Sequence, residues 1–371
     1  MSGIRNSIST DEIVAQLNQR ADTLAPKLLP GGRREGRHWC CGSINGEKGN
    51  SLKLTVAGAG KGLWTDFATT QGMPEHGGNM LCLVALTMFG GTHQEAWRDA
   101  IAWAKSELGL DDLDPARLQT IRREVQQQQA KDDAAARKRA ERMRDKARHL
   151  WFSATEGLGT PAELYLRGRG IDLRGFPPEY RRWPRALRYH PRAWCSEIKG
   201  ELPCMVAAIF SIEGELIACH RTYLDLALLD QGIVTKAKLK DAKLTMGSYA
   251  GGHLPLWKGV HDQKLAAIPH GTDIYVSEGI EDGLSIAMAF PERRIVAGVA
   301  LSNIGGMQLP TQAGRLVLIG QNDTNQKTID AVENSIARQQ RAGRKVATIF
   351  PLPEFKDFND QLCGKRTKVG A

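Results

Sequence analysis

The segments DIYVSEGIEDG (residues 273–283), RLVLIGQND (315–323) and FKDFND (355–360) decide the fold, because acidic residues recur in them at the ends of apolar runs. The runs at 274–276, 316–319 and 346–350 have the length and β-branched content of buried strands. Residues 281–290 and 327–341, which lie between them, are predicted to be helices. Strands that alternate with helices form a parallel sheet with right-handed crossovers. The sequence therefore predicts an α/β fold in this part of the chain.

Acidic residues follow the predicted strands at once or within one turn. They are Glu278, Asp282, Asp323, Asp357 and Asp360. Ligands of parallel sheets bind beyond the carboxyl ends of the strands. Carboxylates gathered there from separate segments repel one another unless a cation lies among them, and Mg²⁺ is the usual partner of carboxylates and phosphates. Each acid taken singly fits a turn or a helix cap, but the ordered set favours a metal site.

The same residues resemble a known domain. Glu278-Gly279 followed by Asp282, a hydrophobic strand that ends in an Asp-x-Asp-like element, and KDFND at 356–360 are similar to the Toprim domain of bacterial-type DNA primases, topoisomerases and some nucleases. More narrowly, the chain resembles the Toprim primases of phages, plasmids and integrative elements. Residues 161–170, 202–224 and 243–257 resemble the block that precedes Toprim in those primases, and residues 36–84 resemble their N-terminal module.

This resemblance implies a DNA primase, which makes short RNA primers on a single-stranded DNA template by Mg²⁺- or Mn²⁺-dependent nucleotidyl transfer. It assigns Glu278 and Asp282 to catalysis. It assigns the metal to Gln321, Asp323, Asp357 and Asp360, and the phosphates of the nucleoside triphosphate to Arg221 and Lys243. His220 would alternate to the face opposite Arg221 and is interpreted as a packed histidine. A replicative helicase acting in trans is a further implied partner.

The chain departs from the Toprim pattern at Gln321-Asn322-Asp323, where the family usually has Asp-x-Asp. A neutral amide can give one oxygen to Mg²⁺ but removes a full charge from the site, so metal affinity should fall. Two alternatives therefore stay open. One is a Toprim-type nuclease that uses water as the nucleophile, and the other is a catalytically weakened replication accessory protein that binds single-stranded DNA.

Composition points to an anionic partner and a reducing compartment. The 371 residues carry a net charge of +9, and the sequence pI is about 9.2. Seven irregularly spaced cysteines do not suggest a disulfide framework. No apolar run reaches the ~18 residues that span a bilayer. We therefore expect a soluble, cytoplasmic protein with no membrane partner.

A stretch of arginines and aromatics after residue 165 has the composition of a single-strand track, in which guanidinium groups hold phosphates and rings stack on bases. Packing of the aromatics in the core is an equally weighted alternative. The DNA-binding residues predicted there are Arg167, Arg169, Arg181, Arg182 and Trp183. The other basic stretch, 121–150, is poor in apolar residues and predicts a solvated helix.

The N-terminal module lacks the paired ligands that tetrahedral zinc requires. Cys40 and Cys41 are adjacent and would point to opposite faces of a strand, and His76 and Cys82 are too loosely spaced. We expect no zinc, with β-hairpins at 45–46 and 58–62 and a helix at 94–108 that ends at Gly109. The predicted domains are a zinc-ribbon-like module (1–110), a basic helical linker (111–152), a mixed primase-core subdomain (153–262) and a Rossmann-like Toprim domain (263–371).

Overall fold

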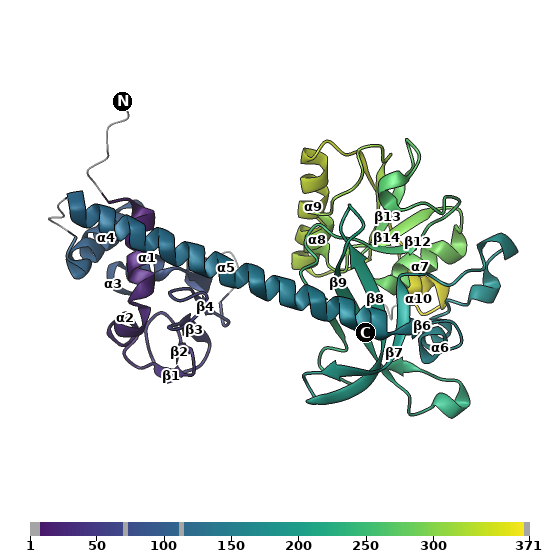
Figure 1. Ribbon diagram of the computed structural model, residues 1–371, viewed down its shortest axis with the longest axis horizontal. Coiled ribbons are helices and arrows are strands. Elements are labelled where there is room, and N and C mark those ends of the chain that lie inside the picture. The colour runs from purple at the N-terminus through teal and green to yellow at the C-terminus, as the bar shows by residue number, and fades with distance from the viewer. Residues whose placement is uncertain (1–7, 70–72, 111–114, 367–371) are drawn as a thin grey trace. The chain divides into compact units, whose positions relative to one another are not determined.

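The computed structural model describes residues 8–69, 73–110 and 115–366, and the chain forms two compact units, Met1–Arg137 and Lys138–Ala371 (Figure 1). The predicted basic helix is present as α5 (Pro115–Ser153), which contributes residues to both units. The domain boundaries predicted at residues 110, 152 and 262 stay predictions. Among the described residues, no helix has the length and the apolarity needed to cross a bilayer.

The N-terminal unit packs helices on a small antiparallel sheet of order β1-β2-β3-β4-β5. Its elements before α5 are α1 (Thr10–Gln19), α2 (Ala21–Leu28), β1 (Arg33–Glu35), β2 (His38–Cys41), β3 (Leu52–Thr55), β4 (Trp64–Asp66), β5 (Gly77–Gly78), α3 (Met80–Phe89) and α4 (Gln94–Leu108). Helix α1 begins with a capping box between Ser9 and Glu12. The core joins Ile13 and Leu17 of α1 to Leu54 and Trp64 of the sheet, so this unit folds around apolar packing.

The N-terminal hairpins and the helix predicted at 94–108 are confirmed. The turns at 45–46 and 58–62 connect β2 to β3 and β3 to β4, which pair antiparallel. Gly62 has a φ of 86°, and a Cβ there would lie 2.3 Å from the side-chain oxygen of Asn18, so only glycine fits this turn. Helix α4 ends at Gly109, which has the left-handed conformation of a helix C-cap.

The first half of the C-terminal unit is an antiparallel sheet of order β10-β9-β8-β7-β6, with β11 paired to β9. Its strands are β6 (Thr155–Glu156), β7 (Leu187–Cys195), β8 (Gly200–Phe210), β9 (Leu216–Asp225), β10 (Thr235–Lys236) and β11 (Lys243–Gly247). The hairpin predicted around residues 213–214 is the β8–β9 connection. Trp151 and Ala147, near the end of α5, pack on one face of this sheet, while Tyr165 of α6 (Pro161–Gly168) belongs to the core on the other face.

The second half of this unit contains the predicted parallel sheet. Its order is β12-β14-β13-β15-β16, and all neighbouring pairs are parallel except β12 with β14. The elements are β12 (Leu254–Trp257), β13 (Ile274–Ser277), α7 (Ile280–Ala289), β14 (Arg294–Ala297), α8 (Leu301–Ile304), β15 (Leu316–Ile319), α9 (Gln326–Arg341), β16 (Val346–Ile349) and α10 (Phe358–Leu362). The predicted α/β class is confirmed, and the antiparallel edge strand β12 and the strand β14 are additions that the sequence did not indicate.

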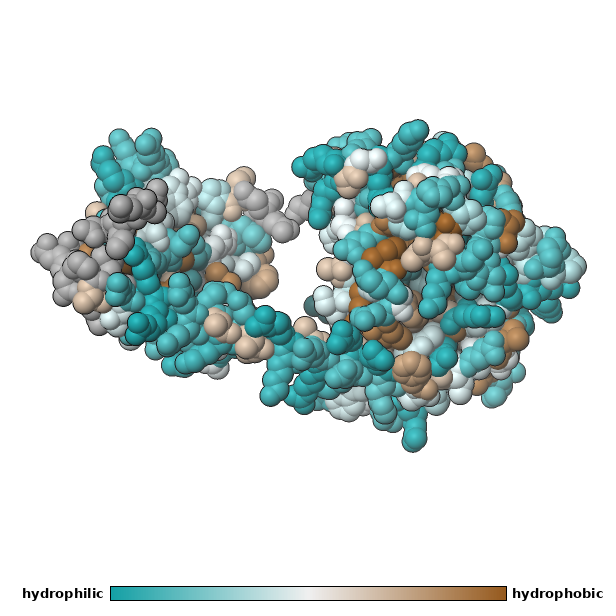
Figure 2. All heavy atoms as spheres, turned by 45° about the horizontal axis from the view of Figure 1, so that its top comes forward, coloured by the Kyte–Doolittle hydropathy of each residue, from teal (hydrophilic) through white to brown (hydrophobic). Residues whose placement is uncertain are grey.

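Figure 2 shows that polar side chains cover most of the visible surface, and that hydrophobic side chains gather in places on the visible face of the C-terminal unit. Several large apolar residues of that unit are exposed, among them Trp194, Phe290 and Phe350. Single exposed apolar residues are ordinary on protein surfaces and carry no functional argument by themselves.

Candidate functional site

A polar cleft of about 290 Å³ lies at the carboxyl ends of β13 and β14. It combines acidic and basic side chains from both halves of the C-terminal unit. Those that could take part in chemistry are Arg169, His220, Lys236, Lys243, Glu278, Glu281, Asp282, Gln321, Asp357 and Asn359. Parallel sheets bind ligands at this edge, so the position of the cleft agrees with the sequence prediction.

Glu278 follows the last residue of β13, where the chain turns into α7. Burial raises the pKa of its carboxyl, and the charge of Asp323 adds to this, while a backbone hydrogen bond from Leu301 and the ammonium of Lys243 act in the opposite direction. A carboxyl with a raised pKa binds protons more readily than an ordinary glutamate. This property suits a general base.

Asp282 and Asp357 form the acidic pair of the cleft. Burial and the neighbouring charge of Asp357 raise the pKa of Asp282 to about 6. Two donors partly offset this, since Gln321 Nε2 donates to Asp282 Oδ2 (2.8 Å) and the backbone N–H of Asn359 donates to Asp282 Oδ1 (3.2 Å). Asp357 is also the N-cap of α10 and accepts from the N–H of Asp360 (2.7 Å). The cleft therefore holds two mutually repelling carboxylates, of which Asp282 is buried and Asp357 half-buried.

Glu281, which the sequence analysis did not single out, is as buried as Asp282, at 6% exposure. Lys243 Nζ donates to its Oε2 (2.8 Å), and the Tyr165 hydroxyl donates to its Oε1 (2.5 Å). Burial alone would raise the pKa of Glu281, but Lys243 and these hydrogen bonds outweigh it and hold the pKa near 2. Burial, followed by the charge of Glu281 and the hydrogen bond to it, raises the pKa of Tyr165. Glu281 is thus ionised and fixes the ammonium group of Lys243 at the wall of the cleft.

Among the described residues, no group of three or more His, Cys, Asp or Glu side chains is arranged to hold a metal ion alone. Mg²⁺ commonly uses only one or two carboxylates and takes its other ligands from water and substrate phosphates. The Asp282–Asp357 pair fits that requirement, because its repulsion is what a cation would relieve.

The comparison with protein families assigns the domain that carries this cleft. Residues 273–367 match the family model of the Toprim domain. The C-terminal domain of this chain is a Toprim domain. Residues 141–256 match a second family, described as a domain of unknown function (DUF7146). No curated protein gives a significant match to the chain. The resemblance to Toprim proteins that the sequence suggested is thereby confirmed.

Primase domains are among the solved structures that are similar to this chain. The zinc-binding and RNA polymerase domains of the Aquifex aeolicus primase match 96% of this chain and 83% of their own length, with 14% identity and a TM-score of 0.38. The primase fragment of the bacteriophage T7 primase-helicase matches 55% of this chain and 70% of its own length, with 17% identity and a TM-score of 0.34. The RNA polymerase domain of the Mycobacterium tuberculosis primase matches 62% and 81%, with 14% identity and a TM-score of 0.36.

The Toprim cleft, as we call the 290 Å³ cleft above, includes only part of the predicted metal set. Gln321 and Asp357 line it, whereas Asp323 and Asp360 do not. Asp323 Oδ1 accepts from the N–H of Asn325 (2.8 Å) in a local turn, and Asp360 lies in the first turn of α10. Both are turn or helix-start residues, the alternative that the sequence also allowed.

The prediction that Arg221 faces the Toprim cleft is wrong, and His220 faces it instead. Arg221 Nη1 donates to the hydroxyl of Tyr223 (2.8 Å) and to the carbonyl of Trp194 (3.2 Å), on the face of β9 that α5 covers. His220 hydrogen-bonds through Nδ1 to Thr245 Oγ1 (3.1 Å), and burial lowers its pKa to about 4, so it is neutral. Lys243 pairs opposite Thr222 in β11 and lines the cleft as predicted.

The predicted single-strand track is also corrected at Trp183. Its ring lies in the core with 6% exposure, and its indole N–H donates to the carbonyl of Leu187 (2.6 Å), so it cannot stack on a base. Arg181 and Arg182 donate to the carbonyls of Phe176 (3.0 Å) and Gly259 (2.7 Å).

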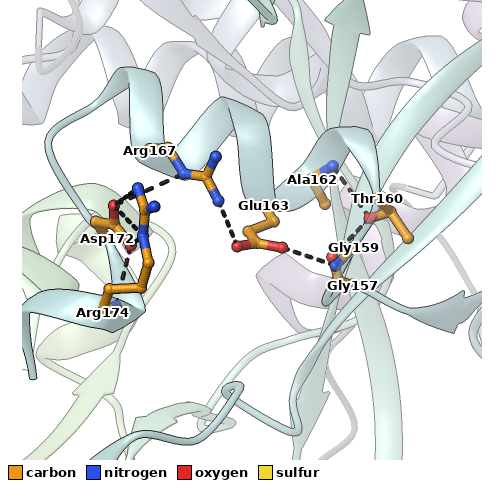
Figure 3. Close-up of polar contacts among 8 residues, drawn as sticks. All are labelled: Gly157, Gly159, Thr160, Ala162, Glu163, Arg167, Asp172 and Arg174. Carbon is orange, nitrogen blue, oxygen red and sulfur yellow. Dashed lines mark hydrogen bonds and ion pairs between the residues drawn. The ribbon is translucent and has the colours of Figure 1, made fainter. Parts of the chain in front are cut away.

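Figure 3 shows that Arg167 lies between Glu163 and Asp172, which also pairs with Arg174. Arg169 alone of the predicted set lines the Toprim cleft. Its Nε is buried and has no hydrogen-bond partner among the described residues.

The N-terminal cysteines make no metal-type cluster among the residues that the structure describes. Cys41 donates from Sγ to the carbonyl of Ser43 (3.2 Å), and burial raises the pKa of the Cys41 thiol to about 11. Burial likewise raises the pKa of the Cys82 thiol. His76 contacts Thr69 through Nδ1. The expectation that the module binds no zinc stays a prediction.

Proposed function

We propose that the chain is a primase-like nucleotidyltransferase that synthesises short RNA primers on single-stranded DNA in the Toprim cleft. The observation that carries the proposal is the opposition of charges across one cleft. Glu278, Asp282 and Asp357 lie on the Toprim side, while Lys243 and Arg169 come from the preceding subdomain. Joining nucleotides requires both a site for Mg²⁺ and cationic groups for the triphosphate, and this cleft supports both.

Each side chain has a distinct role in this proposal. Asp282 and Asp357 would hold Mg²⁺, which when bound neutralises phosphate charge during in-line transfer. Lys243, fixed by Glu281, contacts phosphate oxygens of the incoming nucleotide, and Arg169, which also lines the cleft, supplies a second positive charge. Glu278 accepts the proton of the primer 3′-hydroxyl, a role that its raised pKa favours.

The partners that follow from this proposal are a single-stranded DNA template, nucleoside triphosphates and a replicative helicase supplied in trans. Mn²⁺ should replace Mg²⁺, because it accepts oxygen ligands in similar geometry. The basic net charge of +9 favours the nucleic acid partner. We propose that primer synthesis takes place in the cytoplasm, and this location stays a prediction.

Gln321 supports a second candidate, an accessory protein that binds single-stranded DNA without catalysis. Its amide donates to Asp282 where the family usually has another carboxylate, so the cleft carries less negative charge than an ordinary Toprim site. A Toprim nuclease is the third candidate, because the same base could act on water.

One assay separates the three candidates. The protein is incubated with a single-stranded template, Mg²⁺ or Mn²⁺ and labelled ribonucleotides, and products are resolved on a gel. New oligoribonucleotides support the primase, and a shortened template supports the nuclease. The absence of both products supports the accessory protein.

Glu278→Gln should abolish primer synthesis by deleting one charge at nearly constant shape. The matched control is Glu292→Gln, which changes an exposed acid of the same domain that pairs with Arg293, and it should keep full activity. Primer synthesis by Glu278→Gln at the wild-type rate would contradict the proposed mechanism.

A further inference from the structure

A second cavity, of about 250 Å³, lies at the opposite end of strand β14 from the Toprim cleft. Arg294, the first residue of β14, lines this cavity, whereas Ala297, the last residue, lines the Toprim cleft. The β8–β9 turn, the end of β12 and the short helical turn Leu265–Ala267 complete the wall. The two sites share no lining residue, so a ligand here would not be the proposed substrate.

The wall of this second cavity is apolar and its mouth is basic. Phe210, Pro255, Trp257 and Leu265 supply apolar surface. The basic side chains at the cavity are Arg182, Arg185, Lys258, Lys264 and Arg294, and the acids are Glu213 and Asp262. Lys258 already pairs with Asp262 (2.7 Å). Cations therefore exceed anions around an apolar space, which is the environment of a ligand that is both apolar and anionic.

Arg294 is the decisive residue of the cavity, because it is a buried cation with no direct ion pair among the described residues, and the carboxylate of Asp262 acts on it only at longer range. It is 3% exposed, and among the described residues no carboxylate lies within 4 Å of its guanidinium. Its Nη1 donates to the carbonyl of His261 (3.1 Å), and its Nε has no partner there. Burial lowers the pKa of Arg294 to about 10, yet the side chain stays charged at neutral pH. A buried charge that is not directly paired is costly, so an anion that contacts Arg294 in this cavity would stabilise the fold.

His253 adds a second unsatisfied polar group to the same wall. It is 4% exposed, and its Nδ1 has no hydrogen-bond partner among the described residues. Burial lowers the pKa of His253 to about 4, and the charge of Arg294 acts in the same direction, so the imidazole is neutral and its ring can donate or accept one hydrogen bond. Native proteins leave few buried polar groups unpaired, and Arg294 and His253 add such polar groups to an otherwise apolar wall.

We propose that this cavity binds a small carboxylate attached to an aromatic or apolar ring system, with the carboxylate paired to Arg294. The volume is below the 300–1,000 Å³ of ordinary drug-sized pockets, so a ring-sized ligand fits and a nucleoside triphosphate does not. A single guanidinium matches one negative charge in a two-point contact. A phosphate dianion would carry a second charge that Arg294 alone does not neutralise, because the other basic side chains at the cavity are more exposed than Arg294, and this is why the carboxylate is preferred.

The test uses the full chain and two probes that differ only in charge. 2-Naphthoate and its neutral amide, 2-naphthamide, are titrated into the protein by isothermal titration calorimetry without nucleotide or template. We expect naphthoate to bind at least tenfold more tightly than naphthamide, and phenyl phosphate to bind more weakly than naphthoate. Equal affinities for naphthoate and naphthamide would overturn the proposal, and so would a clear preference for phenyl phosphate.

Three variants locate the binding site. Arg294→Met should remove the preference for naphthoate, and Ala266→Trp, at the exposed rim, should block both probes. If Arg294→Met does not fold, Ala266→Trp alone tests the location of the site. Ala266 is exposed, so a larger side chain there need not disturb the core. Glu278→Gln should leave naphthoate binding unchanged. Loss of binding in Glu278→Gln, or full binding in Ala266→Trp, would place the anion elsewhere and contradict the inference, whatever the outcome of the primer assay.

Discussion

Replacing Asp282 by Asn should stabilise the metal-free protein at neutral pH. Asp282 is 6% exposed, and both burial and the charge of Asp357 oppose its ionisation. Asn keeps the shape and can still accept the hydrogen bond that the Asn359 N–H donates. Because the amide carries no charge, the substitution removes the repulsion in the acidic pair. The same change should abolish the proposed activity, since one of the two metal-holding carboxylates is lost.

The magnitude follows from the raised pKa. A carboxyl whose pKa rises from 3.8 to about 6 is less stable in its ionised form by about 3 kcal/mol, at about 1.4 kcal/mol per tenfold change. The folded protein therefore binds more protons than the unfolded chain between pH 4 and 6, and its stability falls as pH rises through that window. Relative to the wild type, Asp282→Asn should gain up to ~3 kcal/mol at pH 8 and roughly half of that at pH 5. For a unit of this size, the gain at pH 8 corresponds to roughly 6–12 °C in melting temperature.

Thermal unfolding in EDTA, followed by calorimetry at pH 5 and pH 8, measures this difference for the transition of the C-terminal unit. Glu292→Gln is the matched control, because it removes an exposed carboxylate that pairs with Arg293, and its effect should stay within about 0.5 kcal/mol. Saturating Mg²⁺ should stabilise the wild type and not Asp282→Asn. If Asp282→Asn melts at or below the wild-type temperature at pH 8, or if its advantage does not shrink toward pH 5, the electrostatic account of the cleft is wrong.

Three other predictions concern single sites. Gln321→Asp should lower the Mg²⁺ concentration for half-maximal activity, and Mn²⁺ should rescue the wild type more than this variant; loss of activity with no metal preference would contradict both. Elemental analysis of purified protein should find far less than one zinc per chain, and a stoichiometric value would point to Cys40 and its neighbours. Glu281→Gln should raise the nucleotide KM, because it releases Lys243. It should also lower the free energy of unfolding by roughly 1–3 kcal/mol. This loss is smaller than that for a fully buried ion pair, because Lys243 reaches solvent. Tyr165→Phe, which keeps that ion pair, should leave KM nearly unchanged.

The sequence predicted the parallel sheet because buried strands with intervening helices leave an unambiguous pattern. The strands expected at 274–276, 316–319 and 346–350 are β13, β15 and β16 within one residue at their ends. Strand β14 was missed because its four residues begin with Arg294, a charged residue that interrupts the apolar signal. Strand β12 was missed because it contains Pro255. Proline is tolerated in a strand at the edge of a sheet, but in a sequence it argues against assigning a strand.

The error at Arg221 has a physical cause in the packing of β9. In a strand with one solvent-exposed face, polar and apolar residues alternate and show which face is buried. Strand β9 instead carries core residues on both faces, Cys219 and Tyr223 on one and Ala218 and Leu224 on the other. Period-two patterning then gives no signal about which face meets the cleft. The pairing of β11 with β9, which places Lys243 opposite Thr222, is a long-range contact that fixes the face and that no local pattern encodes.

Gln321 connects the stability of the cleft with its proposed chemistry. Its amide donates to Asp282, so in the metal-free protein it relieves part of the repulsion between Asp282 and Asp357. A carboxylate at this position would instead add a third negative charge to the buried group and would raise the pKa of Asp282 further. The glutamine therefore favours the empty cleft and disfavours the metal-bound one. Weak metal binding and a stable metal-free fold are in this view two consequences of one residue, and Gln321→Asp should reverse both together, with tighter Mg²⁺ binding and a lower melting temperature in EDTA.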